Sequence, residues 1–167
     1  MKAGRDPSHH FPESPHRASD GLHTDLRGRI LVVDDDADVR EIMSHVLRSA
    51  GHRVTSADDG ATGWAALCAD SFDVLITDHD MPRMSGLDLL RRVRARRLNL
   101  PVVFISGSMS PDEPELLQCL QPGVAMEKPF SLVDLLGTVR NFLTSALRHG
   151  EARDGQTPLG SNGISAT

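Results

Sequence analysis

The sequence predicts an α/β protein built on a doubly wound, five-stranded parallel sheet with helices on both faces. Short apolar runs alternate with amphipathic segments along the middle of the 167-residue chain. Such an alternation favours parallel strands that are buried by helices on both sides. A content of 39% hydrophobic and 25% charged residues is ordinary for a globular protein, and no apolar run is long enough to span a bilayer.

The strands are expected where short apolar runs end in polar residues. A parallel strand reads as a nearly continuous apolar run, because helices cover both of its faces. Pro101 opens the fourth of these runs, and Val54 is the inward side chain of the second. The expected strands are Arg29–Val33, His52–Ala57, Phe72–Thr77, Val102–Ile105 and Val124–Glu127.

The helices are expected where apolar residues recur every three or four positions. Gly51 is placed to end the first helix, and Ser85 and Ser131 are placed as N-caps of later ones. Pro111 and Pro114 leave room for only a short fourth helix. The inward stripe of the first helix comprises Val39, Ile42, Met43, Val46 and Leu47. The expected helices span Asp38–Ser49, Asp59–Ala69, Ser85–Leu98, about Glu115–Leu120 and a segment after Ser131.

The expected domain occupies residues 28–147, between two segments that lack apolar periodicity. Residues 1–27 are rich in Pro, Ser and His, and residues 148–167 are small and polar, so both are expected to be disordered tails. The domain carries 12 Lys and Arg against 17 Asp and Glu, which accounts for the whole net charge of −5. We therefore expect a cytoplasmic protein with no membrane partner and no non-specific nucleic-acid binding.

Three further groups of residues have more than one interpretation. The third helix contains five arginines, at Arg91, Arg92, Arg94, Arg96 and Arg97. They could form a nucleic-acid or basic docking surface, but the amphipathic spacing favours a solvated helix face. The N-terminal segment contains four histidines, at His9, His10, His16 and His23, for which an unstructured arm is favoured over a weak metal site. Cys68 and Cys119 lack CxxC spacing and are expected to be buried thiols.

Polar residues follow four of the strands at the point where each strand ends. Asp34 and Asp35 follow the first strand, Asp78 the third, Ser106 the fourth and Lys128 the fifth. Since right-handed crossovers place all the strand ends at one edge of the sheet, we expect these side chains to share a site. Three carboxylates, a hydroxyl and an ammonium group can together hold a divalent cation and a phosphoryl group.

Each of these residues also has an ordinary structural interpretation. Asp34–Asp36 and Asp38 could cap the next helix and favour its positive end, and Asp78 could close a turn. Ser106 could be a turn serine, and Lys128 could be a solvated surface charge. Their shared position favours a functional site instead, because paired carboxylates suit Mg²⁺ and a carboxylate beside a cation can attack phosphorus to form an acyl phosphate.

With these residues, the chain resembles the receiver domains of response regulators, the phospho-accepting half of two-component signalling. The resemblance covers about residues 28–147. The matching motifs are Val32–Asp36, Asp73–Pro82, Met84–Gly86, Ile105–Gly107 and Lys128–Phe130. The family implies the flavodoxin-like strand order 2-1-3-4-5.

The resemblance implies how the acidic residues act. Asp78 would accept a phosphoryl group from the phosphohistidine of a partner histidine kinase or histidine phosphotransfer protein. Asp35, Asp78 and the backbone carbonyl of Asp80 would bind Mg²⁺ directly. Asp34 would act mainly through a metal-bound water.

The resemblance also implies how the phosphoryl group is read. Lys128 would contact a phosphoryl oxygen, and Ser106 would hydrogen-bond the phosphoryl group and move when it arrives. Many receivers carry an aromatic residue three positions before the lysine, which turns inward on activation. This chain has Ala125 there and no tyrosine at all, so a tyrosine toggle is excluded and output could instead run through Ser108–Pro122.

The sequence therefore predicts a response regulator that changes its contacts with an unidentified downstream protein when Asp78 is phosphorylated. It is not expected to be an enzyme, beyond its own phosphorylation and slow self-dephosphorylation. One alternative is a receiver that only drains phosphate from a shared kinase. Another is a phosphatase of the haloacid-dehalogenase type, which has a motif like Asp78-x-Asp80, although in that class the motif follows the first strand.

Overall fold

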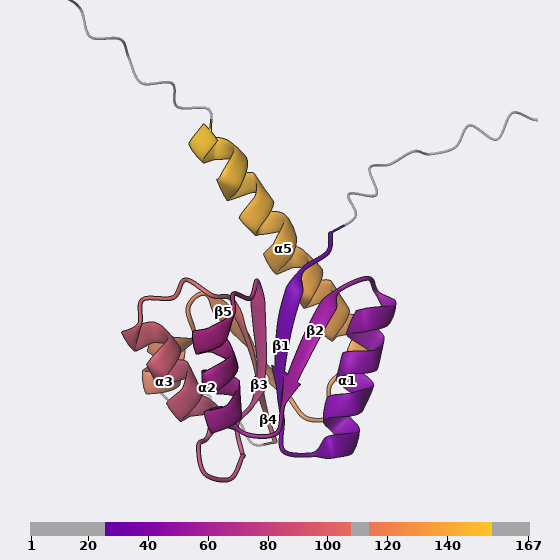
Figure 1. Cartoon of the computed structure of the whole chain (residues 1–167), viewed down its shortest axis with the longest axis vertical. Coiled ribbons are helices and arrows are strands. Elements are labelled where there is room, and N and C mark those ends of the chain that lie inside the picture. The colour runs from indigo at the N-terminus through magenta and orange to yellow at the C-terminus, as the bar shows by residue number, and fades with distance from the viewer. Residues whose placement is uncertain (1–25, 108–113, 155–167) are drawn as a thin grey trace, which may run out of the picture.

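In the computed structural model, which describes residues 26–107 and 114–154, a five-stranded sheet lies between two layers of helices (Figure 1). The strand order is β2-β1-β3-β4-β5 and every pairing is parallel, so the predicted fold class and strand order are confirmed. The strands are β1 (Arg29–Val33), β2 (Arg53–Ala57), β3 (Val74–Asp78), β4 (Val102–Ser106) and β5 (Gly123–Glu127). The helices are α1 (Ala37–Ser49), α2 (Gly60–Ala69), α3 (Gly86–Ala95), α4 (Pro114–Leu120) and α5 (Leu132–Asp154).

Alternate side chains of the central strands enter two separate hydrophobic cores. On β1, Leu31 and Val33 join the core under α2, α3 and α4, whereas Ile30 and Val32 join the core under α1 and α5. β3 and β4 are buried along their whole length, because helices cover both of their faces. Each fully buried aliphatic side chain stabilises the fold by about 1.5–3 kcal/mol, so the strand ends are held in a fixed register.

Polar side chains begin four of the helices. Asp36, Asp59, Ser85 and Ser131 accept hydrogen bonds from backbone N–H groups in the first turns of α1, α2, α3 and α5. The capping role that the acidic run could have had therefore belongs to Asp36. Gly51, with a φ of 94°, follows the end of α1 as predicted, in a conformation that glycine adopts at little cost.

Several details differ from the expectations. Ile42 is 52% exposed, because the sheet covers only the side of α1 that carries Met43 and Leu47. Cys68 lies on the solvent side of α2 and is exposed, while Cys119 is half-buried, so the prediction of buried thiols is wrong. The predicted disordered tails, residues 1–27 and 148–167, lie outside the described residues except for residues 26–27, of which Leu26 packs against the core under α1 and α5, and residues 148–154.

The last helix is longer than expected. α5 continues to Asp154, past the predicted domain end at residue 147, so the predicted boundary needs correction. No proline interrupts this stretch, and Ala146, Leu147 and Arg148 are good helix formers. None of the described helices is long and apolar enough to cross a membrane.

The arginines of α3 do not form a single solvated face, so that interpretation is wrong for Arg94. Its half-buried guanidinium donates hydrogen bonds of 2.7 to 3.2 Å to five backbone carbonyls, at Leu98, Leu100, Cys119, Leu120 and Pro122. These carbonyls belong to the α3–β4 connection and to the end of α4, so one side chain joins two separate connections. Arg96 lies over the ring of Trp64, with 5.3 Å between its guanidinium carbon and the ring centroid.

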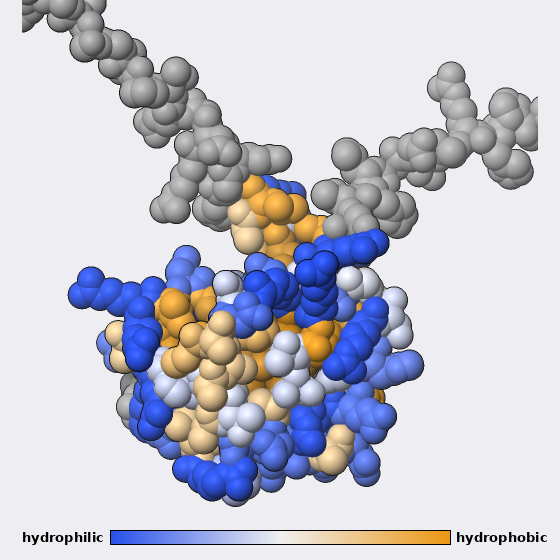
Figure 2. All heavy atoms as spheres, in the orientation of Figure 1, coloured by the Kyte–Doolittle hydropathy of each residue, from blue (hydrophilic) through white to orange (hydrophobic). Residues whose placement is uncertain are grey.

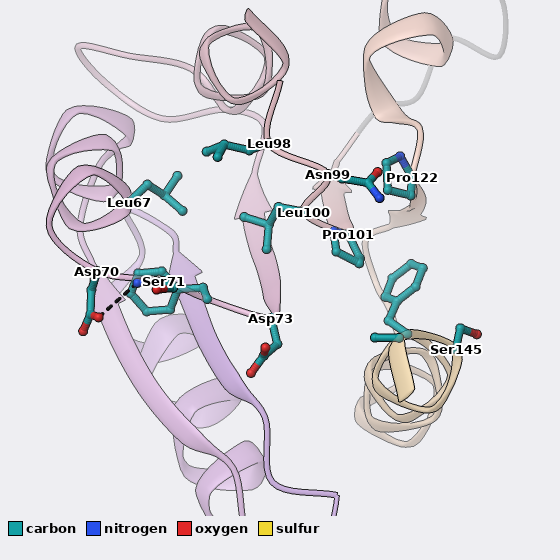
Figure 3. A pocket seen from close by; sticks show the side chains of 13 residues that line it. Leu67, Asp70, Ser71, Asp73, Leu98, Asn99, Leu100, Pro101, Pro122 and Ser145 are labelled. Carbon is teal, nitrogen blue, oxygen red and sulfur yellow. Dashed lines mark hydrogen bonds between the residues drawn. The ribbon is translucent and has the colours of Figure 1, made fainter. Parts of the chain in front are cut away.

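A groove of about 1130 Å³ opens at the edge of the sheet where the strands begin (Figure 3). Its walls come from the α2–β3 connection, the α3–β4 connection and α5, and they include Phe72, Leu100 and Phe142. Figure 2 shows apolar side chains gathered along the part of α5 that leaves the body of the domain. The groove lies at the opposite end of the strands from the polar residues of the predicted site, so the two are separate.

Replacing Arg94 by methionine should lower the free energy of unfolding by about 2–4 kcal/mol, because several partly buried carbonyls lose a charged donor. Urea unfolding followed by circular dichroism measures this loss. Arg92→Met, an exposed neighbour on the same helix, should change the free energy of unfolding by less than about 0.5 kcal/mol. Equal effects of the two substitutions would contradict the role assigned to Arg94.

His52 should make the domain less stable as the pH falls below about 6.5. The N–H of Gly28 donates to Nδ1 of His52 over 3.3 Å, and burial lowers the pKa of His52 below its usual 6.5. The unfolded chain then takes up the proton more readily than the folded domain, so the contribution present above pH 6.5 is lost on acidification.

Urea midpoints measured between about pH 7 and about pH 5.5 test this expectation. His52→Asn should show a flatter dependence on pH than the wild type. His45→Asn, which replaces an exposed histidine of α1, should keep the wild-type dependence. Parallel curves for the wild type and His52→Asn would rule out this contribution.

Candidate functional site

The ends of β1, β3, β4 and β5 bring the predicted polar residues to one edge of the sheet. Asp34 follows β1 directly, Asp78 and Ser106 are the last residues of β3 and β4, and Lys128 follows β5. The register of the parallel pairs places these ends side by side. The N–H of Lys128 continues the ladder by donating to the carbonyl of Ser106 over 2.9 Å, so β4 positions the lysine.

One ammonium group lies between two buried carboxylates at this edge. Nζ of Lys128 is 2.6 Å from Oδ1 of Asp78 and 4.0 Å from Oδ2 of Asp34. Asp34 is fully buried and Asp78 is 2% exposed, whereas the lysine side chain is 34% exposed. Leaving a buried carboxylate without its partner costs about 3–5 kcal/mol, so the cluster depends on the lysine.

The environment of the cluster shifts the pKa values of Asp34 and Lys128. Burial raises the pKa of Asp34, and the negative charges of Asp78 and Asp35 raise it further, while the N–H of Asp36 and the charge of Lys128 oppose the shift. Partial burial alone would lower the pKa of Lys128, but its hydrogen bond to Asp78 and the neighbouring negative charges raise the pKa above its usual value. The lysine is therefore held in its charged form.

Backbone donors fix the orientation of both buried carboxylates. Oδ2 of Asp78 accepts a hydrogen bond of 2.8 Å from the N–H of Asp80, and Oδ1 of Asp34 accepts one of 2.9 Å from the N–H of Asp36. Among the described residues, Oδ2 of Asp34 is a buried oxygen with no hydrogen-bond donor. An acceptor in that condition is unfavourable unless a cation or a water satisfies it.

The residue types at this edge are those that bind Mg²⁺, although their side chains are not arranged around a single point. Carboxylate and carbonyl oxygens are the ligands that Mg²⁺ prefers, and the orphan Oδ2 of Asp34 is directed into the site. Asp35 and Asp80 are exposed at the rim, where water can complete the coordination shell. No three His, Cys, Asp or Glu side chains in the described part of the chain form a ready-made metal cluster.

Three residues that shape the site were given no role in it from the sequence. Gly86 lies so close to Asp78 that a Cβ would be 2.0 Å from the Asp78 carbonyl oxygen. Asp59 and Arg83, 24 positions apart, form an ion pair beside the β3–α3 connection. The Ser85-Gly86 pair at a helix start could have indicated a close approach, but no sequence pattern links Asp59 with Arg83.

These features together define a receiver domain of two-component signalling. The chain belongs to this family, because the model of the response regulator receiver domain matches residues 30–140. The response regulator receiver protein CpdR of Brucella abortus is 34% identical over 71% of this chain and 98% of its own length. The chemotaxis protein CheY of Pseudomonas aeruginosa is 41% identical over 62% of this chain and 86% of its own length.

Solved structures show the same fold. The chemotaxis protein CheY4 of Vibrio cholerae superimposes with a TM-score of 0.64 at 31% identity, and the match covers 70% of this chain and 98% of that one. A CheY-like receiver domain from Methanospirillum hungatei superimposes with a TM-score of 0.69 at 25% identity, covering 74% of this chain and 99% of that one. Receiver domains accept phosphoryl groups from histidine kinases and are generally signalling proteins rather than enzymes, which argues against the phosphatase alternative.

Replacing Gly86 by alanine should disturb the site, because its Cβ would overlap the backbone of Asp78. We expect a loss of about 1–3 kcal/mol in the free energy of unfolding, measured in urea. Gly137 of α5 offers a matched control, since nothing lies within 4 Å of a Cβ built there. Gly137→Ala should stabilise the helix by up to about 1 kcal/mol, and a similar gain for Gly86→Ala would contradict the close approach.

Proposed function

We propose that this chain is a phospho-accepting response regulator in which Asp78 takes a phosphoryl group from the phosphohistidine of a partner histidine kinase or phosphotransfer protein. The observation that carries the proposal is the buried carboxylate of Asp78, held 2.6 Å from the ammonium of Lys128 and beside a second buried acid, Asp34. Such a group is placed to react with phosphorus, and the charge needed to stabilise the transferred group is already beside it.

The transfer is a single displacement at phosphorus. A carboxylate oxygen of Asp78 forms the new O–P bond as the P–N bond of the phosphohistidine breaks, and the imidazole nitrogen leaves with the bonding electrons. Negative charge spreads over the phosphoryl oxygens in the transition state. Lys128, kept protonated by its acidic neighbours, provides a positive charge where this negative charge develops.

Asp35, Asp78 and the backbone carbonyl of Asp80 would hold Mg²⁺, and Asp34 would act mainly through a metal-bound water. When bound, Mg²⁺ supplies positive charge that offsets both the acidic residues and the incoming phosphoryl group. The chain itself orients the nucleophile, because the N–H of Asp80 fixes Oδ2 of Asp78. The connection that donates this N–H therefore serves the nucleophile and the cation together.

Phosphorylation would then change what the protein contacts. The acyl phosphate carries about two negative charges in place of one, and it adds acceptor oxygens. The hydroxyl of Ser106 at the end of β4 would hydrogen-bond these oxygens and shift the β4–α4 connection, which we take as the surface that a downstream protein reads. The part of this connection from 108 to 113 lies outside the described residues.

A second candidate, a receiver that drains phosphate from a shared kinase without an output of its own, is favoured by one observation. Ala125, at the position of the family's aromatic toggle, lies beside Phe104 in the β4–β5 register. Phe104 is 1% exposed and already belongs to the core on that side of the sheet. The two candidates differ in whether the phosphorylated form binds a target protein more tightly than the unphosphorylated form.

Intact-protein mass spectrometry after incubation with a small phosphodonor and Mg²⁺ tests the proposed acceptor. The wild type should gain one phosphate and Asp78→Asn none, whereas Asp134→Asn, at an exposed position of α5, should be labelled like the wild type. Lys128→Met should be labelled about 100-fold more slowly, because the transition state loses a positive charge. Equal labelling of Asp78→Asn and the wild type would overturn the assignment.

A further inference from the structure

The connection between β3 and α3 is anchored on both sides of Arg83. Met81 and Met84 are 8% and 9% exposed and pack into the core under α2, α3 and α4. Arg83, between them, has a φ of 66°, which lies in the left-handed region that non-glycine residues seldom adopt. A residue held in that region requires interactions that compensate for the strain.

An ion pair with Asp59 provides such an interaction. Nε and Nη2 of Arg83 both contact Oδ2 of Asp59, whose side chain is 3% exposed, while the arginine side chain is 65% exposed. Oδ1 of Asp59 accepts a hydrogen bond of 2.6 Å from the N–H of Thr62 as the N-cap of α2. The Thr62 N–H, together with Arg83, holds the pKa of Asp59 below its usual value, so the carboxylate stays charged.

The same connection lies directly against the first turn of α2. A Cβ added to Gly60 would be 2.5 Å from the carbonyl oxygen of Met84, so the two backbones are in close contact. At the other end of the connection, the N–H of Asp80 donates to Oδ2 of Asp78 over 2.8 Å. The connection is therefore attached to α2 on one side and to the candidate phospho-acceptor on the other.

We propose that the Asp59–Arg83 ion pair is a positioning device that holds the backbone carbonyl of Asp80 toward the cation and so sets the affinity of the site for Mg²⁺. The inference rests on the proposed function, because it requires Mg²⁺ to bind at Asp35, Asp78 and Asp80. Without the ion pair, the β3–α3 connection would sample more conformations. Binding of Mg²⁺ would then be weaker, because the connection would lose conformational entropy when the cation binds. Outer groups that orient metal ligands commonly change affinity by about tenfold or more.

Two substitutions remove the ion pair and retain the local backbone. Asp59→Asn keeps an N-cap of similar strength, and Arg83→Asn places a residue that tolerates positive φ. Isothermal titration calorimetry with magnesium chloride should show a Kd about tenfold higher for each variant, and no further increase for the double variant. Arg83→Lys, which keeps the charge, should recover part of the affinity.

Urea unfolding without Mg²⁺ separates positioning from a merely structural role. The double variant Asp59→Asn/Arg83→Asn should keep a midpoint near that of the wild type, because no buried charge is left unpaired and the strain at position 83 is relieved, while its Mg²⁺ affinity still falls. Asp70→Asn breaks an ion pair with Arg29 at the opposite edge of the sheet and should leave the Kd for Mg²⁺ unchanged. An effect of Asp70→Asn equal to that of Asp59→Asn would show that general loss of stability, and not positioning, is responsible.

The outcome for Asp35→Asn distinguishes a failure of the positioning role from a failure of the metal site. If this variant loses Mg²⁺ affinity while Asp59→Asn and Arg83→Asn stay within about twofold of the wild type, the positioning role is overturned and the proposed function stands. If the wild type binds Mg²⁺ no better than Asp35→Asn, the metal site is overturned and the positioning role with it.

Discussion

The whole polar edge of the sheet depends on the ammonium of Lys128, which is shared between Asp78 and Asp34. Two carboxylates withdrawn from water repel each other strongly, and neither is tolerated there without a nearby positive charge. The lysine follows β5, the last strand in the sequence. Pairing of β5 with β4 places it, through the hydrogen bond from its N–H to the carbonyl of Ser106. The acidic site therefore depends on the parallel strand order, which brings Lys128 to the two carboxylates.

Different residues stabilise the sheet and provide the reactive groups at its edge. Side chains of the strands fill two cores and hold the strand ends in register, while the reactive groups are the last strand residues or the first residues beyond them. The β3–α3 connection belongs to both classes, since Met81 and Met84 are core residues and Asp80 is at the site. Function therefore relies on a connection that two buried methionines anchor to the core.

The strands, the helices and the grouping of Asp34, Asp78 and Lys128 could be predicted, because apolar runs, cap residues and strand ends leave a local mark in the sequence. The strand order came from the family resemblance and not from these patterns. Contacts between segments that are far apart in the sequence leave no local pattern in it. Arg94 resembles one more exposed arginine, because α4 and the α4–β5 connection, which provide carbonyls to it, are distant in the sequence. Ile42 fitted the stripe of α1, yet it lies away from the buried side of the helix and is exposed.

The hydrogen bonds of Arg94 also limit which part of α4 could move in response to Ser106. Its guanidinium holds the carbonyls of Cys119, Leu120 and Pro122, so the last turn of α4 and the entry to β5 are fastened to α3. If the proposed switch at Ser106 acts on α4, this attachment would keep the last turn of the helix in place and confine the displacement to the turn before it.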